Sequence, residues 1–552
     1  MIVDSDLDMP STSQSVRRAG QKDLRLAAAL RSCAVFLVFL VVVVGLQIAS
    51  GAYHAEFSGY PDEPAHYVTS LMIHDYITDF KPVSPLGFAW NFYDHYPKVA
   101  LGHWPPFFYV IQAFWMMLFS PTRTSVRLEL AVITALLAYA VFTEARRWFG
   151  SKAAVLAGLL MICLPLVQMY TDEEMAETLL TLLCFWSAIY FARYLDSEHW
   201  RDSLWFGVFF SLAVLTKGNG WLLAFIPPLA LLLTRKLRLL ARPSFWLPIL
   251  MVSVSCIPWQ AMTMEVAQRG WVGGSGPSLQ YTASALWQFL HIFVAIGGPV
   301  LSILIAIGIV LKVLAPMFKR PVASGPAVMV VLILAAWIFH SLVPAGVEDR
   351  KILIAVPALI LFLFAGAIWV ADRLPLGNAL TRWRRPLVAG VAALAFSIQT
   401  FAIPHLKHYG YTEAARFITS NSELRGATIL VSSESGGEGL LVSEIAMDEP
   451  HPTRTIIRGT KALANVDWTG SNYKSLFSTP AEIMNYLEQH HVGLVVLDTF
   501  TPQVHFLHNE LLRDAVRQPG RTHLIATFPQ ASSAATGQIQ VFRIEDARKS
   551  QN

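Results

Sequence analysis

Residues 33–50 read CAVFLVFLVVVVGLQIAS and carry no charged side chain. The basic residues that precede this run resemble the start of a signal peptide: Arg17, Arg18, Lys22, Arg25 and Arg31. The run is long, and no clear Ala-x-Ala-like cleavage site follows it, so it predicts a retained first transmembrane span. The whole chain is 54% hydrophobic and 14% charged, whereas soluble proteins carry about 25% charged residues. The composition therefore predicts a polytopic protein of the lipid bilayer.

Further apolar runs approach the roughly 20 residues that a helix needs to cross a bilayer. They bring the predicted total to about 11 spans, at 126–144, 153–170, 175–192, 203–216, 220–234, 244–262, 284–311, 327–343, 352–371 and 387–403. Residues 105–119, PPFFYVIQAFWMMLF, are too short to cross and begin with two prolines. They predict an interfacial or re-entrant helix.

The loops between these runs differ in their basic residues. One alternate set carries 21 Lys and Arg, whereas the other carries eight up to residue 403. The basic set comprises 1–32, 145–152, 193–202, 235–242, 312–320 and 373–385. Because basic loops stay in the cytoplasm, the sorting predicts a cytoplasmic N-terminus and an extracytoplasmic C-terminus.

Residues 405–552 differ in character from the rest of the chain. Short β-rich runs at 427–433, 453–459, 493–498, 524–528 and 539–544 alternate with helical segments. The helical segments are TEAARFITSN, PAEIMNYLEQHH and NELLRDAVRQ. This alternation predicts a small α/β domain with a largely parallel sheet. The predicted domains are a basic cytoplasmic tail (1–32), a transmembrane domain (33–403) whose first extracytoplasmic loop (51–120) holds interfacial helices, and an extracytoplasmic α/β domain (405–552).

Ionisable residues gather at the predicted extracytoplasmic boundaries. GYPDEPAHYVTSLMIHDY (59–76) follows the first span, and the other segments are YPKVALGHWPPFFY (96–109), YTDEEMAETLL (170–180), LTKGNGW (215–221) and VPAGVEDRKIL (343–353). Each has a purely structural interpretation, such as a helix N-cap at Asp62, a snorkelling Lys217 or a local pair between Asp349 and Arg350. Their convergence favours function, since charge at a membrane boundary is costly.

Acids and bases at one interface suggest chemistry on a lipid-linked anion. A carboxylate can take the proton of an acceptor hydroxyl, and Lys or Arg can hold a phosphate. The four cysteines, Cys33, Cys163, Cys184 and Cys256, lie in apolar segments and lack metal-ligand spacing.

The ordered motifs resemble the GT-C glycosyltransferase superfamily. They resemble most of all family 39, the polyprenyl- or dolichyl-phosphate-sugar-dependent enzymes that include protein mannosyltransferase-like and aminoarabinose transferase-like members. The motifs are PDEPAHYVTSLM, GHWPPFFYVIQAFWMMLF, EEMAETLLTLL, LTKGNGWLL and EDRKILIAVPALILFL. Two departures stand out: Glu177 occupies a place that is usually Asp, and Arg350-Lys351 replaces an Arg-Tyr pair.

The resemblance implies a membrane glycosyltransferase of the bacterial cell membrane, active in envelope glycan, glycolipid or glycoprotein synthesis. Its donor would be a polyprenyl-phosphate sugar, its acceptor a hydroxyl of a lipid, glycan or protein, and no nucleic acid is implied. Asp62 would be the catalytic base, supported by Glu63, and Lys217 and Arg350 would bind the donor phosphate. The donor and acceptor pocket would include His66, His103, Asp172, Glu173 and Glu177. No cofactor is certain, and a divalent metal ion is left open.

Two other classes of protein share some of these features. A transporter or flippase of lipid-linked sugars would also be polytopic, but its binding residues commonly lie near the bilayer midplane. Here the charges gather at one face, which favours an enzyme. A membrane-anchored envelope assembly protein would need one span rather than many.

Overall fold

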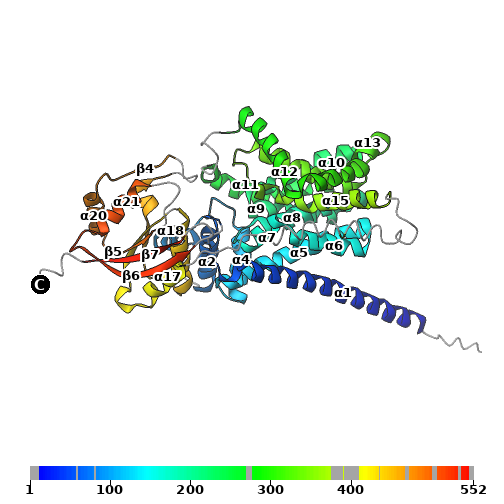
Figure 1. The fold of residues 1–552 in the computed structure, drawn as a ribbon. Coiled ribbons are helices and arrows are strands. Elements are labelled where there is room, and N and C mark those ends of the chain that lie inside the picture. Colours follow the sequence, from blue (N-terminus) through cyan, green and yellow to red (C-terminus); the bar gives the residue numbers. More distant parts are fainter. Residues whose placement is uncertain are drawn as a thin grey trace, which may run out of the picture.

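The fold has two parts, a bundle of long helices and a smaller sheet domain, with helices of the first loop between them (Figure 1). The computed structural model describes residues 12–57, 60–79, 83–268, 276–373, 390, 410–433, 435–466, 472–499, 506–531 and 536–545. The predicted span at 387–403 lies outside the described residues.

The described parts of the bundle and of the first loop consist mainly of helices. Their α-helices are α1 (Thr12–Ser50), α2 (Glu63–Asp79), α3 (Pro85–His95), α4 (Phe107–Leu118), α5 (Arg123–Phe149), α6 (Ser151–Cys163), α7 (Pro165–Asp172), α8 (Glu177–Ser197), α9 (Trp200–Thr216), α10 (Ile226–Thr234), α11 (Pro243–Gln268), α12 (Leu279–Ile309), α13 (Ala315–Lys319), α14 (Ser324–Leu342) and α15 (Val356–Ala371). Shorter turns of other helix types are η1 (Ala52–His54), η2 (Gly218–Phe225), η3 (Leu237–Ala241), η5 (Val310–Leu314) and η6 (Asp349–Ala355). Helix α1 begins inside the predicted tail 1–32, so part of that tail continues the first span.

The part of the chain that the structure describes contains most of the predicted membrane spans. Within the described residues seven helices have the required length and apolarity, or eight if α6 and α7 form one bent span. Of the other predicted spans, 220–234 falls within Gly218–Thr234, a shorter apolar helix, and 203–216 falls within the 17-residue helix α9. The predicted short helix at 105–119 is confirmed as α4. Pro165 explains the 58° bend between α6 and α7, because a proline forces the preceding residue, Leu164, into an extended conformation.

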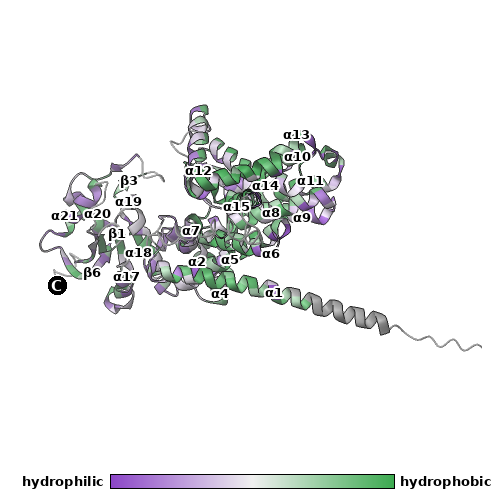
Figure 2. Ribbon diagram, turned by 45° about the vertical axis from the view of Figure 1, so that its right-hand side comes forward, coloured by the Kyte–Doolittle hydropathy of each residue, from purple (hydrophilic) through white to green (hydrophobic). Residues whose placement is uncertain are grey.

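The outer helices expose apolar side chains of the kind that face lipid. Val41 of α1, Leu250 of α11 and Trp287 of α12 are each more than half exposed, and Figure 2 shows hydrophobic stretches on α12 and on the coloured part of α1. Inside the bundle, α12 and α15 approach closely at Gly308 and Gly366. A Cβ atom on Gly308 would lie 2.0 Å from the backbone oxygen of Phe362. Glycine is therefore required for this contact, as is common between membrane helices.

The sheet domain contains a mixed five-stranded sheet in the order β2-β1-β5-β7-β6. The elements are β1 (Thr428–Ser432), β2 (Ile456–Arg458), β5 (Val492–Asp498), β6 (Thr522–Ala531), β7 (Thr536–Ile544), a small pair β3 (Ala464–Asn465) and β4 (Lys474–Ser475), and helices α17 (Tyr411–Ser420), α18 (Ser435–Asp448), α19 (Gly459–Ala462), α20 (Pro480–Gln489), α21 (Leu507–Val516) and η8 (Ser422–Leu424).

The five predicted main strands and three helices are confirmed, but the largely parallel sheet is wrong. β1 pairs in parallel with β2 and β5, whereas β7 runs antiparallel to β5 and β6. Only residues 532–535 separate β6 from β7, and this is too short for the crossover that a parallel pair requires. Alternate residues of β1 face opposite sides. Ile429 joins the core under α17 and α18, and Leu430 joins the core under α20 and α21.

The sheet domain packs on the first loop through α17 and α18. One hydrophobic core combines Tyr67 and Leu71 of α2 with Ile445 of α18 and Ile429 of β1. Polar contacts surround this core: Arg123 pairs with Glu444 at 2.5 Å, and the Tyr96 hydroxyl donates to Glu449 at 2.8 Å. The sheet domain is thus attached to the loop that carries Asp62.

The bundle has one basic end and one acidic end. At the basic end, Lys236 lies 3.0 Å from Asp196 and Arg242 lies 2.5 Å from Glu198. Helix α8 ends there and begins with Glu177, about 30 Å away at 1.5 Å per residue. Glu177 lies at the end that faces the sheet domain, so this basic group and Glu177 lie at opposite ends of α8.

Candidate active site

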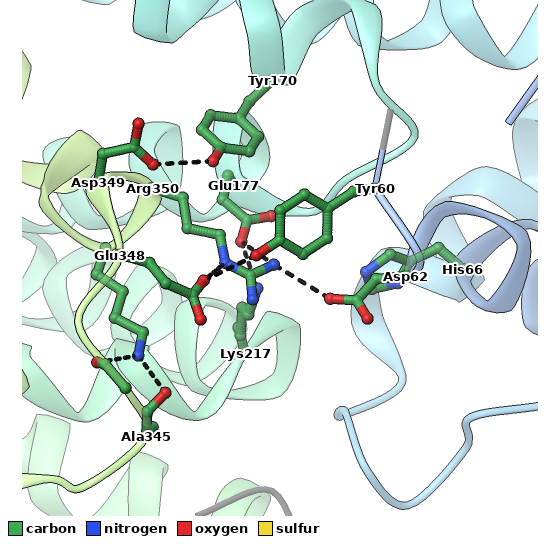
Figure 3. Close-up of polar contacts among 12 residues, drawn as sticks. Tyr60, Asp62, His66, Tyr170, Glu177, Lys217, Ala345, Glu348, Asp349 and Arg350 are labelled. Carbon is green, nitrogen blue, oxygen red and sulfur yellow. Dashed lines mark hydrogen bonds and ion pairs between the residues drawn. The ribbon is translucent and has the colours of Figure 1, made fainter. Parts of the chain in front are cut away.

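The centre of the candidate site is an ion pair between the first loop and a late helix (Figure 3). Asp62 stands directly before α2, and Arg350 lies in η6. Arg350 Nη1 donates to Asp62 Oδ2 at 3.1 Å. Both side chains are about 85% buried. Within the described residues the second oxygen of Asp62, Oδ1, has no hydrogen-bond partner, which leaves it available to a substrate.

Two further side chains orient the Arg350 guanidinium. Arg350 Nε donates to Glu348 Oε2, and the guanidinium carbon lies 4.4 Å from the centre of the Tyr60 ring. The Tyr60 hydroxyl donates to the same Glu348 oxygen at 3.2 Å. A planar guanidinium that is stacked and bonded in this way has one orientation. The sequence did not indicate a role for Tyr60 or Glu348, although Glu348 lies only two positions before Arg350.

Glu177 and Lys217 complete the charged cluster. Lys217 follows α9 and donates to Glu177 Oε1, which also lies 3.8 Å from Arg350 Nη1. The cluster therefore holds two cations and three carboxylates: Lys217, Arg350, Asp62, Glu177 and Glu348. Four of the predicted site residues, Asp62, Glu177, Lys217 and Arg350, are brought together.

His66 lies one turn after Asp62 on the buried face of α2. Its Nδ1 is 3.1 Å from the Tyr109 hydroxyl, and its ring centre is 4.4 Å from that of Trp104. Burial lowers the pKa of His66 to about 4, with Asp62 opposing this shift, so the imidazole is neutral at physiological pH. His103 lies beside Trp104 with ring centres 6.3 Å apart. The two predicted histidines thus flank one tryptophan.

The other predicted acids, Glu63, Asp172 and Glu173, are not members of the five-residue charged cluster. Glu63 is fully buried and accepts backbone N–H bonds from Tyr60 at 3.2 Å and Glu174 at 2.7 Å. These bonds tie the Asp62 turn to the loop before α8. Asp172 has Arg127 and Glu63 as charged neighbours. Burial raises the pKa of Glu173, assisted by Glu63 and Glu177.

Lys98 is a charged neighbour of Asp62, and the sequence assigned no role to it. It is half-buried beside the cluster, and within the described residues no carboxylate pairs with its ammonium. Burial lowers the pKa of Lys98 to about 7; Arg458 lowers it further, and Asp62 and Glu438 oppose the shift. The signal in the sequence was weak, because Lys98 is one of several loop lysines.

The described residues contain no group of three or more His, Cys, Asp or Glu side chains arranged to hold a metal ion. The divalent ion that the sequence left open stays a prediction.

Comparisons with known proteins address the fold. Residues 103–261 match the family model described as dolichyl-phosphate-mannose-protein mannosyltransferase. The apo structure of ArnT from Cupriavidus metallidurans is similar over 93% of this chain and 98% of that chain, with a TM-score of 0.59 and 16% identity. The fold is that of the GT-C glycosyltransferases. The resemblance inferred from the motifs is confirmed at this level.

Other GT-C structures are similar over most of this chain. ArnT bound to undecaprenyl phosphate has a TM-score of 0.58 and 15% identity, over 92% of this chain and 97% of that chain. The apo oligosaccharyltransferase of Archaeoglobus fulgidus has a TM-score of 0.55 and 14% identity, over 85% and 69%. No curated protein sequence matches the chain. The GT-C family model spans Glu177 and Lys217 but neither Asp62 nor Arg350, so the matched residues contain only part of the charged cluster.

Proposed function

We propose that the protein transfers a sugar from a polyprenyl-phosphate donor to a hydroxyl group of a lipid, glycan or protein acceptor. The observation that supports this most is the Asp62–Arg350 pair at the acidic end of a GT-C bundle. It places a carboxylate with an available oxygen next to cations that suit a phosphate. ArnT, whose fold is similar, has been solved with undecaprenyl phosphate bound.

The proposed reaction is a single displacement. Asp62 Oδ1 accepts the proton of the acceptor hydroxyl while that oxygen forms a bond to the anomeric carbon. The bond from this carbon to the phosphate oxygen breaks, and its electron pair leaves with the polyprenyl phosphate. Attack opposite the leaving group inverts the anomeric centre. Arg350 orients the Asp62 carboxylate toward the acceptor.

The donor phosphate is a diester with one negative charge. The five-residue cluster of Asp62, Glu177, Glu348, Lys217 and Arg350 already has one more carboxylate than cations, so it cannot bind an anion without help. Lys98 supplies the missing positive charge on the side of Asp62. We infer that Lys98, Lys217 and Arg350 together hold the phosphate, and that the phosphate competes with the carboxylates for Arg350.

The proposed location is a bacterial cell membrane with the charged cluster and the sheet domain on the extracytoplasmic side. The support is the separation of the basic loops from the cluster by the length of α8, together with the positive-inside rule. A reporter that is active only in the cytoplasm, fused after residue 552, is expected to be silent. A strong signal would reverse the orientation.

The experiment that tests the function supplies a labelled polyprenyl-phosphate sugar and a mixture of envelope acceptors to the purified protein in vesicles. A transferase releases free polyprenyl phosphate and labels an acceptor. A flippase moves the intact lipid across the bilayer and breaks no bond. Translocation without release of polyprenyl phosphate would replace the proposed function with transport.

A further inference from the structure

The sheet domain contacts the turn that carries Lys98. Arg458, the last residue of β2, donates from Nη1 to the backbone oxygen of Pro97 at 3.5 Å. On the other side of the turn, the Lys98 backbone N–H donates to the backbone oxygen of Tyr96, whose hydroxyl bonds to Glu449 of the sheet domain. The Pro97–Lys98 turn is therefore held from both sides by residues more than 350 positions away.

Arg458 is itself fixed by a fully buried carboxylate. Its Nε donates to Glu438 Oε2 at 3.0 Å, and Glu438 lies in the first turn of α18. The other oxygen of Glu438 accepts the backbone N–H of Thr460 at 2.7 Å. Because both of its oxygens are bonded, Glu438 has one orientation, and its bond to Arg458 fixes the orientation of the guanidinium.

The side chain of Lys98 crosses α18 at Gly439. A Cβ atom on Gly439 would lie 2.8 Å from Lys98 Cε and 3.2 Å from Cβ of Pro64. The absence of a side chain at Gly439 thus gives Lys98 its path toward Asp62, which lies two positions before Pro64. Gly436, in the same first turn, would meet nothing within 4 Å, so it provides a matched control.

Four charged groups face the Lys98 ammonium. Arg458 and Lys461 from the sheet domain lower its pKa, and Asp62 of the first loop and Glu438 of α18 raise it, on top of the larger effect of burial. Three of these four groups belong to the sheet domain. The charge of Lys98 therefore depends on the position of the sheet domain relative to the first loop.

We propose that Arg458 is a positioning residue of the transfer site, which the sheet domain supplies by holding the Pro97–Lys98 turn so that the Lys98 ammonium faces the donor phosphate. This inference rests on the proposed function, because it takes the phosphate of the donor as the ligand of Lys98. It gives the sheet domain a specific role, since donor binding then depends on its docking through Arg458, Glu438 and Gly439.

The first test needs no turnover. The full-length protein is labelled with acetic anhydride across a pH series, and mass spectrometry reports the pH at which Lys98 becomes reactive. In the wild type this midpoint should lie near the pKa of about 7. Arg458→Gln should shift it upward, because a facing cation is lost, and Glu438→Gln should shift it downward, because a facing carboxylate is lost. A general loosening of the domain would hydrate Lys98 and shift both variants upward.

Shifts in the same direction, no shift for Arg458→Gln, or a wild-type Lys98 that stays unreactive below pH 9 would each overturn the proposal. These outcomes do not depend on activity. If the proposed function is wrong, the labelling still reports whether Arg458 and Glu438 affect the environment of Lys98.

The second test measures the donor KM of purified variants with the labelled polyprenyl-phosphate sugar. Gly439→Ala places a methyl group on the path of Lys98, so donor KM should rise about tenfold, the order expected when a charged hydrogen-bond partner is displaced. Gly436→Ala should leave donor KM within about twofold of the wild type, because its methyl group would meet no neighbour. Equal donor KM for the two alanine variants would contradict the proposed role of α18.

Discussion

Arg350 Nη1 lies 3.1 Å from Asp62 Oδ2, although the two residues are 288 positions apart in the chain. The contact joins the start of the first loop to the segment before the last described helix of the bundle, α15. It also means that the site is complete only when the whole bundle has formed. Because Arg350 already has Glu348 and Tyr60 as partners, its remaining donors are directed at Asp62 and at any bound anion.

Replacing Arg350 with lysine should raise the donor KM about tenfold or more. Lysine keeps the charge but lacks the planar fork that bonds Asp62 and Glu348 together. Initial rates at varied donor and saturating acceptor measure this effect. Arg373→Lys is a matched control, because Arg373 stacks on Trp369 just beyond the end of α15 and should keep the wild-type KM. An unchanged KM for Arg350→Lys would remove the guanidinium from the phosphate site.

The effects of substituting Lys217 and Glu177 on the stability of the protein should depend on each other. Lys217→Met leaves Glu177 with a weaker set of partners, and breaking a buried pair costs about 3–5 kcal/mol. Lys217→Met with Glu177→Gln removes both charges and should unfold at a higher temperature than Lys217→Met alone. Thermal unfolding of the purified variants in detergent gives the comparison. If the two single effects simply add in the double variant, the pair is not coupled as described.

Donor binding by the wild type should weaken above about pH 7. The pKa of Lys98 is lowered to about 7, so the ammonium is charged below this pH and neutral above it, whereas the phosphodiester stays charged throughout. Donor KM should therefore rise as the pH increases from about 6 to about 9. Lys98→Arg keeps its charge over this range and should remove the rise. A wild-type KM that stays flat over the same range would exclude Lys98 from the phosphate site.

Glu63→Gln should reduce the stability of the fold markedly and reduce kcat only slightly. The glutamine offers one acceptor oxygen in place of the two that bond the N–H groups of Tyr60 and Glu174. Leaving one of these buried donors unpaired costs about 1–3 kcal/mol. The variant should melt earlier, and its kcat per folded molecule should fall far less than that of Asp62→Asn. A normal melting temperature with lost turnover would place Glu63 in the chemistry instead.

The sequence predicted the members of the cluster better than their contacts. Sorting of Lys and Arg placed Asp62, Glu177, Lys217 and Arg350 at one end, since loop charge follows membrane sidedness. It did not predict that Arg350 bonds Asp62, because a contact across 288 residues depends on helix packing that no local pattern encodes. Glu63 illustrates the same limit, since an adjacent carboxylate can face backbone N–H groups rather than the site.

In the sheet domain, the short connection between β6 and β7 determines how these strands pair, whereas local sequence did not predict helix α18. β6 and β7 lie too close in sequence for a parallel pair, so the chain length between them predicts the antiparallel arrangement. Helix α18 was missed because SGGEGLL begins with glycines, which are poor helix formers. Its buried Leu441 and Ile445 pack against the sheet and α2, and this tertiary contact stabilises a helix that the local sequence disfavours.

In the proposed reaction, Asp62 is the base for glycosyl transfer from a polyprenyl-phosphate sugar. The most direct measurement is the release of polyprenyl phosphate by purified wild-type protein and Asp62→Asn with donor and acceptor both saturating. Asparagine keeps the shape but cannot accept the proton, so turnover should fall about 10²–10⁴-fold, while donor binding persists. Near-normal turnover by Asp62→Asn would exclude Asp62 as the base and place the base at another carboxylate of the cluster.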